Sequence, residues 1–84
     1  MNVKQEYTYK LVKEGEVTNV EVTPHPDWEE FDQFVELFID HEGATLIAQD
    51  IGMDRHQVRY RKGQHQFILQ FEHYTGSIWI ETDF

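Results

Sequence analysis

The chain has 84 residues, enough for a single domain, which we place at residues 1–84. It contains no cysteine, so neither a disulfide framework nor a thiolate zinc site can form. The net charge of −9 argues against nonspecific binding to nucleic acid or to an anionic membrane, because phosphate contacts need clustered lysine and arginine. No stretch approaches the about 20 apolar residues of a membrane span, and the first six residues lack a signal-peptide pattern. We therefore expect a cytoplasmic protein.

The first predicted elements are two strands joined by a hairpin turn. Residues 7–12 alternate aromatic and polar side chains, and this period of two indicates a half-buried strand. Gly15 suits the turn that follows, and residues 17–22 are rich in the β-branched side chains typical of strands. Pro24 and Pro26 end the second strand, because proline cannot donate to a β ladder.

An amphipathic helix is predicted over residues 26–41. Its apolar side chains recur at spacings of three and four and make one stripe: Trp28, Phe31, Phe34, Val35 and Phe38. Acidic side chains at 27, 29 and 30 suit the positive end of a helix. Glu29, Asp32, Glu36 and Asp40 fall largely on the side away from the stripe. Gly43 is a natural residue to end the helix.

Four more strands are predicted at residues 45–51, 57–61, 64–72 and 77–82. The sequence therefore predicts an α+β domain, with one amphipathic helix packed on a mostly antiparallel sheet in the order β-β-α-β-β-β-β. Phe67, Leu69 and Phe71 share one face of that sheet, whereas Ile68 and Trp79 point to the other. A helix of about 16 residues spans about 24 Å and cannot cover both faces. Ile68 and Trp79 are either ordinary surface hydrophobes or an interface with a second copy or another protein.

Charge is unevenly distributed along the chain. No lysine or arginine occurs from Glu14 to Asp54, a stretch that holds most of the 16 acidic residues. The acidic helix face is either a solvated surface or a docking face for a basic protein partner. A basic cluster follows and either neutralises carboxylates across the sheet or contacts nucleic acid: Arg55, Arg59, Arg61 and Lys62. RNA binding would need aromatic side chains beside these cations. Tyr60 faces the other way, so we expect no nucleic-acid partner.

The turn at residues 52–57 carries the densest set of reactive side chains. Asp54 can hold His56 in one tautomer, His56 can then act as a general base, and Arg55 can bind an anionic group. Alternatively, Asp54 caps the turn or pairs with Arg55, and His56 is a polar strand residue. The chain has a single serine, Ser77, and no cysteine, so it offers no obvious nucleophile. The five histidines lack metal-ligand spacing, and we expect neither a metal nor a cofactor.

Three segments resemble a family of small bacterial proteins known as domain of unknown function 3630. The segments cover residues 52–57, 67–72 and 77–81, and the resemblance extends from Trp28 to Glu81. The family pattern has an Asp-Arg-His motif, a strand ending in glutamate and a Ser-x-Trp-x-Glu strand. The matching positions are Asp54, Arg55, His56, Glu72, Ser77, Trp79 and Glu81. Val58 departs from the family, which has tryptophan near this position. The resemblance implies a bacterial, cytoplasmic, stand-alone domain and no particular activity.

Two hypotheses follow from the sequence. The first is a small noncatalytic interaction or regulatory module that self-associates or binds a basic protein, with Ile68 and Trp79 in an interface. The second is a site for a small anionic ligand, or an enzymatic site, built from Asp54, Arg55 and His56 with Glu72 and Glu81 from neighbouring strands. The second requires these side chains to converge in a concave pocket.

Overall fold

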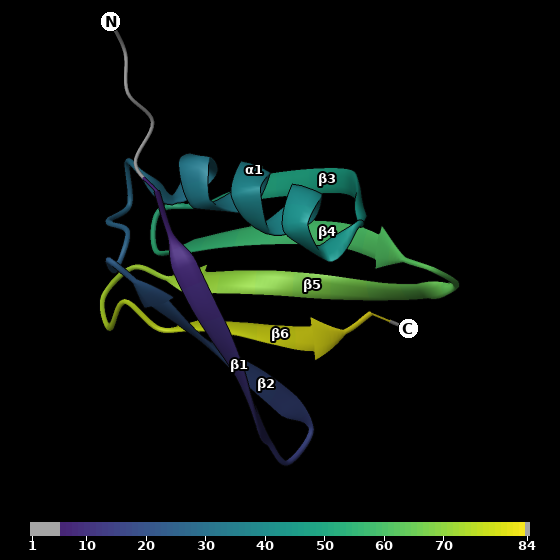
Figure 1. Ribbon diagram of the computed structural model, residues 1–84. Helices are drawn as coiled ribbons and strands as arrows, with labels where there is room; N and C mark the ends of the chain where they lie inside the picture. The colour runs from purple at the N-terminus through teal and green to yellow at the C-terminus, as the bar shows by residue number, and fades with distance from the viewer. Residues whose placement is uncertain (1–5, 84) are drawn as a thin grey trace, which may run out of the picture.

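The computed structural model describes residues 6–83, which form one helix and a six-stranded sheet (Figure 1). The elements in chain order are β1 (Thr8–Glu14), β2 (Val17–Thr23), α1 (Phe31–Glu42), β3 (Thr45–Ile51), β4 (Arg55–Lys62), β5 (His65–Glu72) and β6 (Ile78–Thr82). This order confirms the predicted fold class. The expectation that the first six residues carry no signal peptide concerns residues that lie, except for Glu6, outside the described range.

The sheet is antiparallel throughout, with the strand order β1-β2-β6-β5-β4-β3. Strands β3 to β6 form a meander, and the β1–β2 hairpin joins it through a short ladder in which Thr18 pairs with Ile80 and Asn19 with Trp79. The hairpin therefore runs at a steep angle to the other strands (Figure 1). The connection through α1 carries the chain from β2 to the opposite side of the sheet, so that β1 and β3 are its two edges.

Helix α1 is shorter at its start than the sequence predicts, because it begins at Phe31 and not at residue 26. Residues 27–30 form a turn instead, in which the Glu30 N–H donates to the Asp27 carbonyl (3.2 Å) and side-chain Oδ1 (3.0 Å). Trp28 belongs to this turn and stacks on His73 at 4.8 Å between ring centroids. Tertiary packing of the indole thus outweighs its place in the helical pattern. The predicted helix end is confirmed, since Gly43 has a φ of 65°.

The core lies between α1 and one face of the sheet. Phe31, Phe34 and Phe38 are fully buried on the helix, and they pack against Val58, Leu69 and Tyr60 of the central strands. Strand β1 closes the other side of the helix, with the ring of Tyr9 at 5.7 Å from that of Phe34. Burying each phenylalanine contributes about 1.5–3 kcal/mol. The predicted inward face of β4 and β5 is therefore confirmed.

The opposite face of the sheet has no helix over it. Strand alternation directs Arg55, Arg59, Ile68 and Trp79 to this side. A chain of polar side chains crosses it: the Gln57 Nε2 donates to Gln70 Oε1 (3.1 Å), and Gln70 Nε2 donates to Glu81 Oε2 (2.6 Å). We refer to this side as the open face.

Candidate binding groove between α1 and β3

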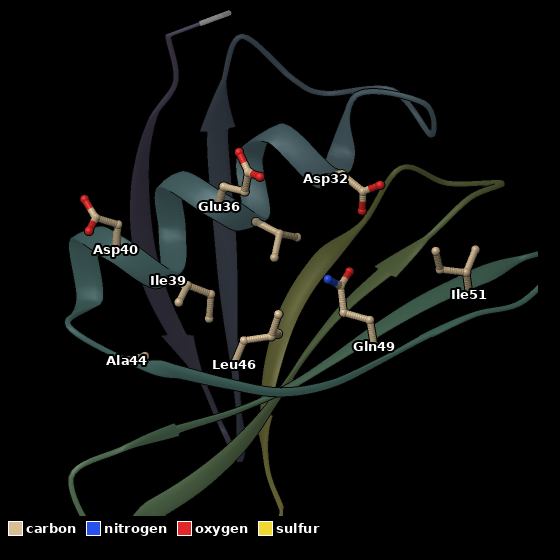
Figure 2. Close-up of a pocket in the computed structure, with 9 residues that line it drawn as sticks. Asp32, Glu36, Ile39, Asp40, Ala44, Leu46, Gln49 and Ile51 are labelled. Atoms are coloured by element: carbon tan, nitrogen blue, oxygen red, sulfur yellow. The ribbon is translucent and has the colours of Figure 1, made fainter.

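A groove of about 650 Å³ separates α1 from the edge strand β3 (Figure 2). The helix and the strand run alongside each other in opposite directions (Figure 2). Ile39 of the helix and Leu46 of the strand point into the space between them, whereas the carboxylates of Glu36 and Asp40 point away from β3. Its lining residues come from α1, from the helix end and from β3: Asp32, Val35, Glu36, Ile39, Asp40, Ala44, Leu46, Gln49 and Ile51. We call this the α1–β3 groove.

The floor of the groove is apolar because two periodic patterns meet there. On α1, Val35 and Ile39 lie at the edge of the buried stripe, one turn apart. On β3, Leu46 pairs with Tyr60, Ala48 with Arg59 and Ile51 with His56. A bulge between Leu46 and Ala48 inserts Ile47 and resets the alternation. Because of this bulge, Leu46 and Ile51 point to the same face although they are five residues apart in sequence.

The upper rim of the groove is acidic. Asp32, Glu36 and Asp40 recur every four residues along α1, and all three are exposed. Residues spaced by four lie about 6 Å apart along a helix and share one side of it. The sequence assigns these carboxylates to a solvent face, and the structure adds that this face borders an apolar groove.

His56 lies at one end of the groove and is only 3% exposed. Its Nε2 lies 2.9 Å from Gln49 Oε1, and because an amide oxygen only accepts, the Nε2–H is the donor. The same nitrogen lies 3.8 Å from Asp32 Oδ1. Burial lowers the pKa of His56, and the nearby Asp32 carboxylate opposes that shift only in part. The imidazole is therefore held neutral at pH 7.

Asp54, Arg55 and His56 do not converge in the described chain. Asp54 is exposed in the turn, where its carbonyl accepts a hydrogen bond from the His73 N–H (2.8 Å). Arg55 and His56 are adjacent in β4 and point to opposite faces of the sheet. The carboxylate nearest to the imidazole belongs to Asp32 of the helix and not to Asp54.

The other predicted site residues gather on the open face with Arg55. The Arg55 guanidinium lies over the Trp79 ring, with its carbon 5.5 Å from the ring centroid. Glu81 accepts hydrogen bonds from Trp79 Nε1 (3.1 Å) and from Gln70. Glu72 accepts from the Thr75 N–H and hydroxyl, both at 2.7 Å, and these bonds lower its pKa. The carboxylates are therefore engaged within the fold.

Ile68 and Trp79 are half-buried on the open face by their polar neighbours. Among residues 6–83, the most exposed large hydrophobic side chains lie elsewhere, and several gather on β3 and in the turn after it: Leu46, Ile47, Ile51 and Met53. Ile51 is 59% exposed and Met53 is 95% exposed. Sequence periodicity did not identify this patch, because a strand of seven mostly apolar residues is equally typical of a buried strand.

A separate cluster of polar side chains joins β1, α1 and β4 at the far end of the helix. The Tyr9 hydroxyl donates to Glu42 Oε2 and lies 2.8 Å from His41 Nδ1, while Lys62 Nζ donates to Glu42 Oε1 at 2.8 Å. Burial alone would raise the pKa of Glu42, but the hydrogen bonds from Lys62 and Tyr9 outweigh it and lower the pKa. Its three elements form one edge of the core, so we assign it a structural role.

Within residues 6–83, no group of three or more histidine, aspartate or glutamate side chains is placed to hold a metal ion. Across the same range, no helix combines the length and the apolar character that crossing a bilayer requires.

The fold and the groove define a small α+β domain with one covered sheet face, one open face and an apolar edge strand. The chain belongs to the family described as protein of unknown function, DUF3630, whose model matches residues 10–84. The match includes most of the N-terminal hairpin, beyond the stretch from Trp28 to Glu81 that carries the resemblance in sequence. No curated protein and no solved structure matches the chain. Val58, the position that departs from the family pattern, is fully buried under α1 and contributes to no surface.

Proposed function

We propose that this domain is a protein-interaction module, and that its α1–β3 groove binds an apolar, positively charged segment of a partner protein. The observation that carries the proposal is the combination of an apolar floor with an acidic rim. Leu46 and Ile51 expose about half of their surface beside Asp32, Glu36 and Asp40. Exposed apolar surface bordered by polar groups is typical of interaction sites.

The shape of the groove favours a polypeptide over a small molecule. Small-molecule sites bury about 70–90% of the ligand and present several convergent polar groups. Here the β3 wall is open to solvent along Leu46 and Ile51, and Gln49 is the main polar group on that wall. An extended groove of this kind contacts a ligand along its length, as peptide-binding grooves do.

The charge on the rim favours a basic ligand. A complementary lysine or arginine can place its apolar stem on the floor and its cationic head at the rim. Such contacts accelerate association and select partners more than they raise affinity, and they weaken with salt. The net charge of −9 gives the whole domain the same preference.

The test is a two-dimensional NMR titration of the labelled domain with short synthetic peptides. One set combines lysine with valine or leucine, and the matched set replaces every lysine by glutamate. We expect the lysine peptides to shift the amide signals of Ile39, Leu46 and Ile51, with affinity that falls about tenfold between 0.05 and 0.5 M NaCl.

A neutralised groove and a matched control decide whether the rim is responsible. The groove variant is D32N/E36Q/D40N, and the control is E14Q/E16Q/E21Q, which removes the same charge from the β1–β2 hairpin. The groove variant should bind several-fold more weakly than the control. Equal loss in both variants, or equal binding of lysine and glutamate peptides, would exclude a specific acidic groove.

A further inference from the structure

The edge of β3 adds a second kind of recognition to the groove. We infer that the partner segment binds as an extended strand, hydrogen-bonded to the free edge of β3, with alternate basic side chains directed toward the rim of α1. This inference rests on the proposed function and specifies the conformation of the ligand. Strand addition to a sheet edge is a common mode of peptide recognition, in which main-chain bonds supply affinity and side-chain pockets supply specificity.

The register of β3 identifies which main-chain groups are available. The Gly52 N–H donates to the Arg55 carbonyl (2.8 Å), so Gly52 and Arg55 form a hydrogen-bonded pair. Such pairs alternate along an antiparallel ladder, and Asp50 opposite Gln57 is the next one. The N–H and carbonyl groups of Gln49 and Ile51 therefore point away from β4. These same residues direct their side chains into the groove.

Charged side chains protect the other edge of the sheet, whereas β3 is protected only at its bulge. Strand β1 carries Lys10, Lys13 and Glu14, and charged side chains on an edge discourage pairing with another chain. Strand β3 has Asp50 as its only charged side chain, and its bulge interrupts the edge at Ile47. The stretch 48–51 after the bulge remains a regular edge with exposed side chains.

The spacing of the rim matches that of an added strand. Side chains on one face of a strand recur every two residues, about 6.6 Å apart. Asp32, Glu36 and Asp40 recur about 6 Å apart on a helix that runs alongside β3 (Figure 2). Long basic side chains on the groove-facing side of the added strand would reach toward this acidic rim, first toward Asp32, which lies nearest to Gln49 and Ile51 (Figure 2). A helical ligand presents one face with spacings of three and four and leaves the edge of β3 unpaired.

A second copy of this chain is a poorer occupant than a basic partner. Antiparallel pairing of two β3 strands would bring two acidic rims toward each other, between molecules that each carry a net charge of −9. Like charges facing each other across an interface disfavour association. A strand with lysine or arginine at every second position has the complementary charge.

Amide hydrogen exchange tests the inference, with a synthetic peptide of alternating lysine and valine as the ligand. We expect saturation with this peptide to slow exchange of the Gln49 and Ile51 amides by at least about tenfold, because each gains a partner or becomes shielded beside one. The Asp50 amide, which already bonds to β4, should change little. A matched peptide is N-methylated at alternate residues, so that the main-chain N–H groups that would donate to β3 are replaced. This peptide should not bind in the same register.

Each outcome separates the ligand conformation from the proposed function. If the peptide binds in the groove but does not protect the Gln49 and Ile51 amides, and if N-methylation does not weaken binding, strand addition is wrong. The proposed interaction module is then still supported. Absence of any salt-sensitive binding in the groove would overturn both. Protection of the two amides in the free domain that rises with protein concentration would identify a second copy as the occupant and overturn the basic partner.

A proline substitution gives an independent test. Ile51→Pro removes an N–H that points away from β4, while Ile51→Ala removes the side chain and keeps that N–H. Loss of peptide affinity in Ile51→Pro well beyond that in Ile51→Ala supports strand addition. Equal affinity of the two variants opposes it, provided that both retain slow exchange at Asp50. If Ile51→Pro does not fold, the N-methylated peptide decides the question.

Discussion

The buried imidazole of His56 connects the helix, the edge strand and the central sheet. Its ring centroid lies 4.9 Å from that of Phe31. Its Nε2–H donates to Gln49 Oε1, and the same nitrogen lies 3.8 Å from Asp32 Oδ1. A neutral histidine suits this environment, since the hydrogen bond to an amide oxygen does not require a charge. Protonation would place a cation in a largely apolar site with one partly solvated carboxylate to balance it.

Folding stability should therefore fall as the pH decreases below about 6.5. The pKa of His56 in the folded state lies below that of the unfolded chain, which is about 6.5. Its contribution is complete above that value and is lost as the pH falls through the folded-state pKa. Urea unfolding between pH 7.5 and 5 measures the slope. The variant His56→Gln should show a smaller slope, and His65→Gln, at an exposed position, should retain it.

An unchanged slope in His56→Gln would assign the pH dependence to another group. Glu42 and Glu72 also have lowered pKa values, but their contributions are lost only as the pH falls below about 4.5. The window between pH 7.5 and 5 therefore separates the imidazole from these two carboxylates.

At the scale of elements, α1 serves the core and the groove with different sides. Phe31, Phe34 and Phe38 face the sheet, whereas Asp32, Glu36 and Asp40 lie on the side of the helix that borders the groove. Stability and the proposed binding thus depend on different positions of the same helix.

The substitutions Phe38→Ala and Asp40→Ala should separate these roles. Phe38 is fully buried and contacts Tyr9 and Tyr60. Its replacement by alanine leaves a cavity and should lower the free energy of unfolding by about 3–5 kcal/mol. Asp40 is exposed at the rim, and its replacement should change stability by less than about 0.5 kcal/mol. Chemical denaturation measures both. Comparable losses in the two variants would show that the rim takes part in the core.

At the scale of the whole molecule, the excess of negative charge opposes the compact state. The chain has 16 acidic and 7 basic residues. The described structure contains attractive pairs, such as Arg59 with Asp83 and Lys62 with Glu42, both on the surface or close to it. Pairs of this kind each contribute at most about 1 kcal/mol. Net repulsion is therefore expected to remain among the exposed carboxylates.

Added salt should stabilise the free domain. Raising NaCl from 0.05 to 0.5 M screens repulsion between exposed charges, and like-charge pairs four residues apart on a helix cost about 0.2–0.5 kcal/mol each. The acidic rim holds two such pairs, Asp32 with Glu36 and Glu36 with Asp40. Thermal unfolding should show a higher midpoint at high salt. A falling midpoint would mean that the attractive pairs dominate, and Asp40→Asn should reduce the rise more than Glu16→Gln.

Local patterns were sufficient for the order of the elements and for most of their bounds. Alternation in β4 and β5 and the stripe on α1 predicted which side chains enter the core, because burial follows a fixed geometric period. The start of α1 was misplaced because Trp28 continues the helical spacing but packs on His73 of a distant turn. The bulge at Ile47 was missed because it depends on pairing with β4 and leaves no local signal.

The candidate site was harder to predict from the sequence than the fold. Adjacent residues in a strand point to opposite faces, so the cluster of Asp54, Arg55 and His56 separates once β4 forms. His56 instead contacts Asp32 and Gln49, two lining residues of the groove that come from α1 and β3. Only Gly43 and Ala44 separate α1 from β3, but which side of the helix borders the strand depends on how α1 packs on the whole sheet.

The sequence by itself determined the α+β class, the amphipathic helix, the inward faces of the strands and the concentration of negative charge before Arg55. These properties depend on periods of two and 3.6 residues and on composition, which are local quantities. The tertiary structure decided that β3 is an edge, that the acidic side of α1 borders it and that His56 is buried between them. These features depend on strand order and register, which arise from contacts between residues distant in the chain.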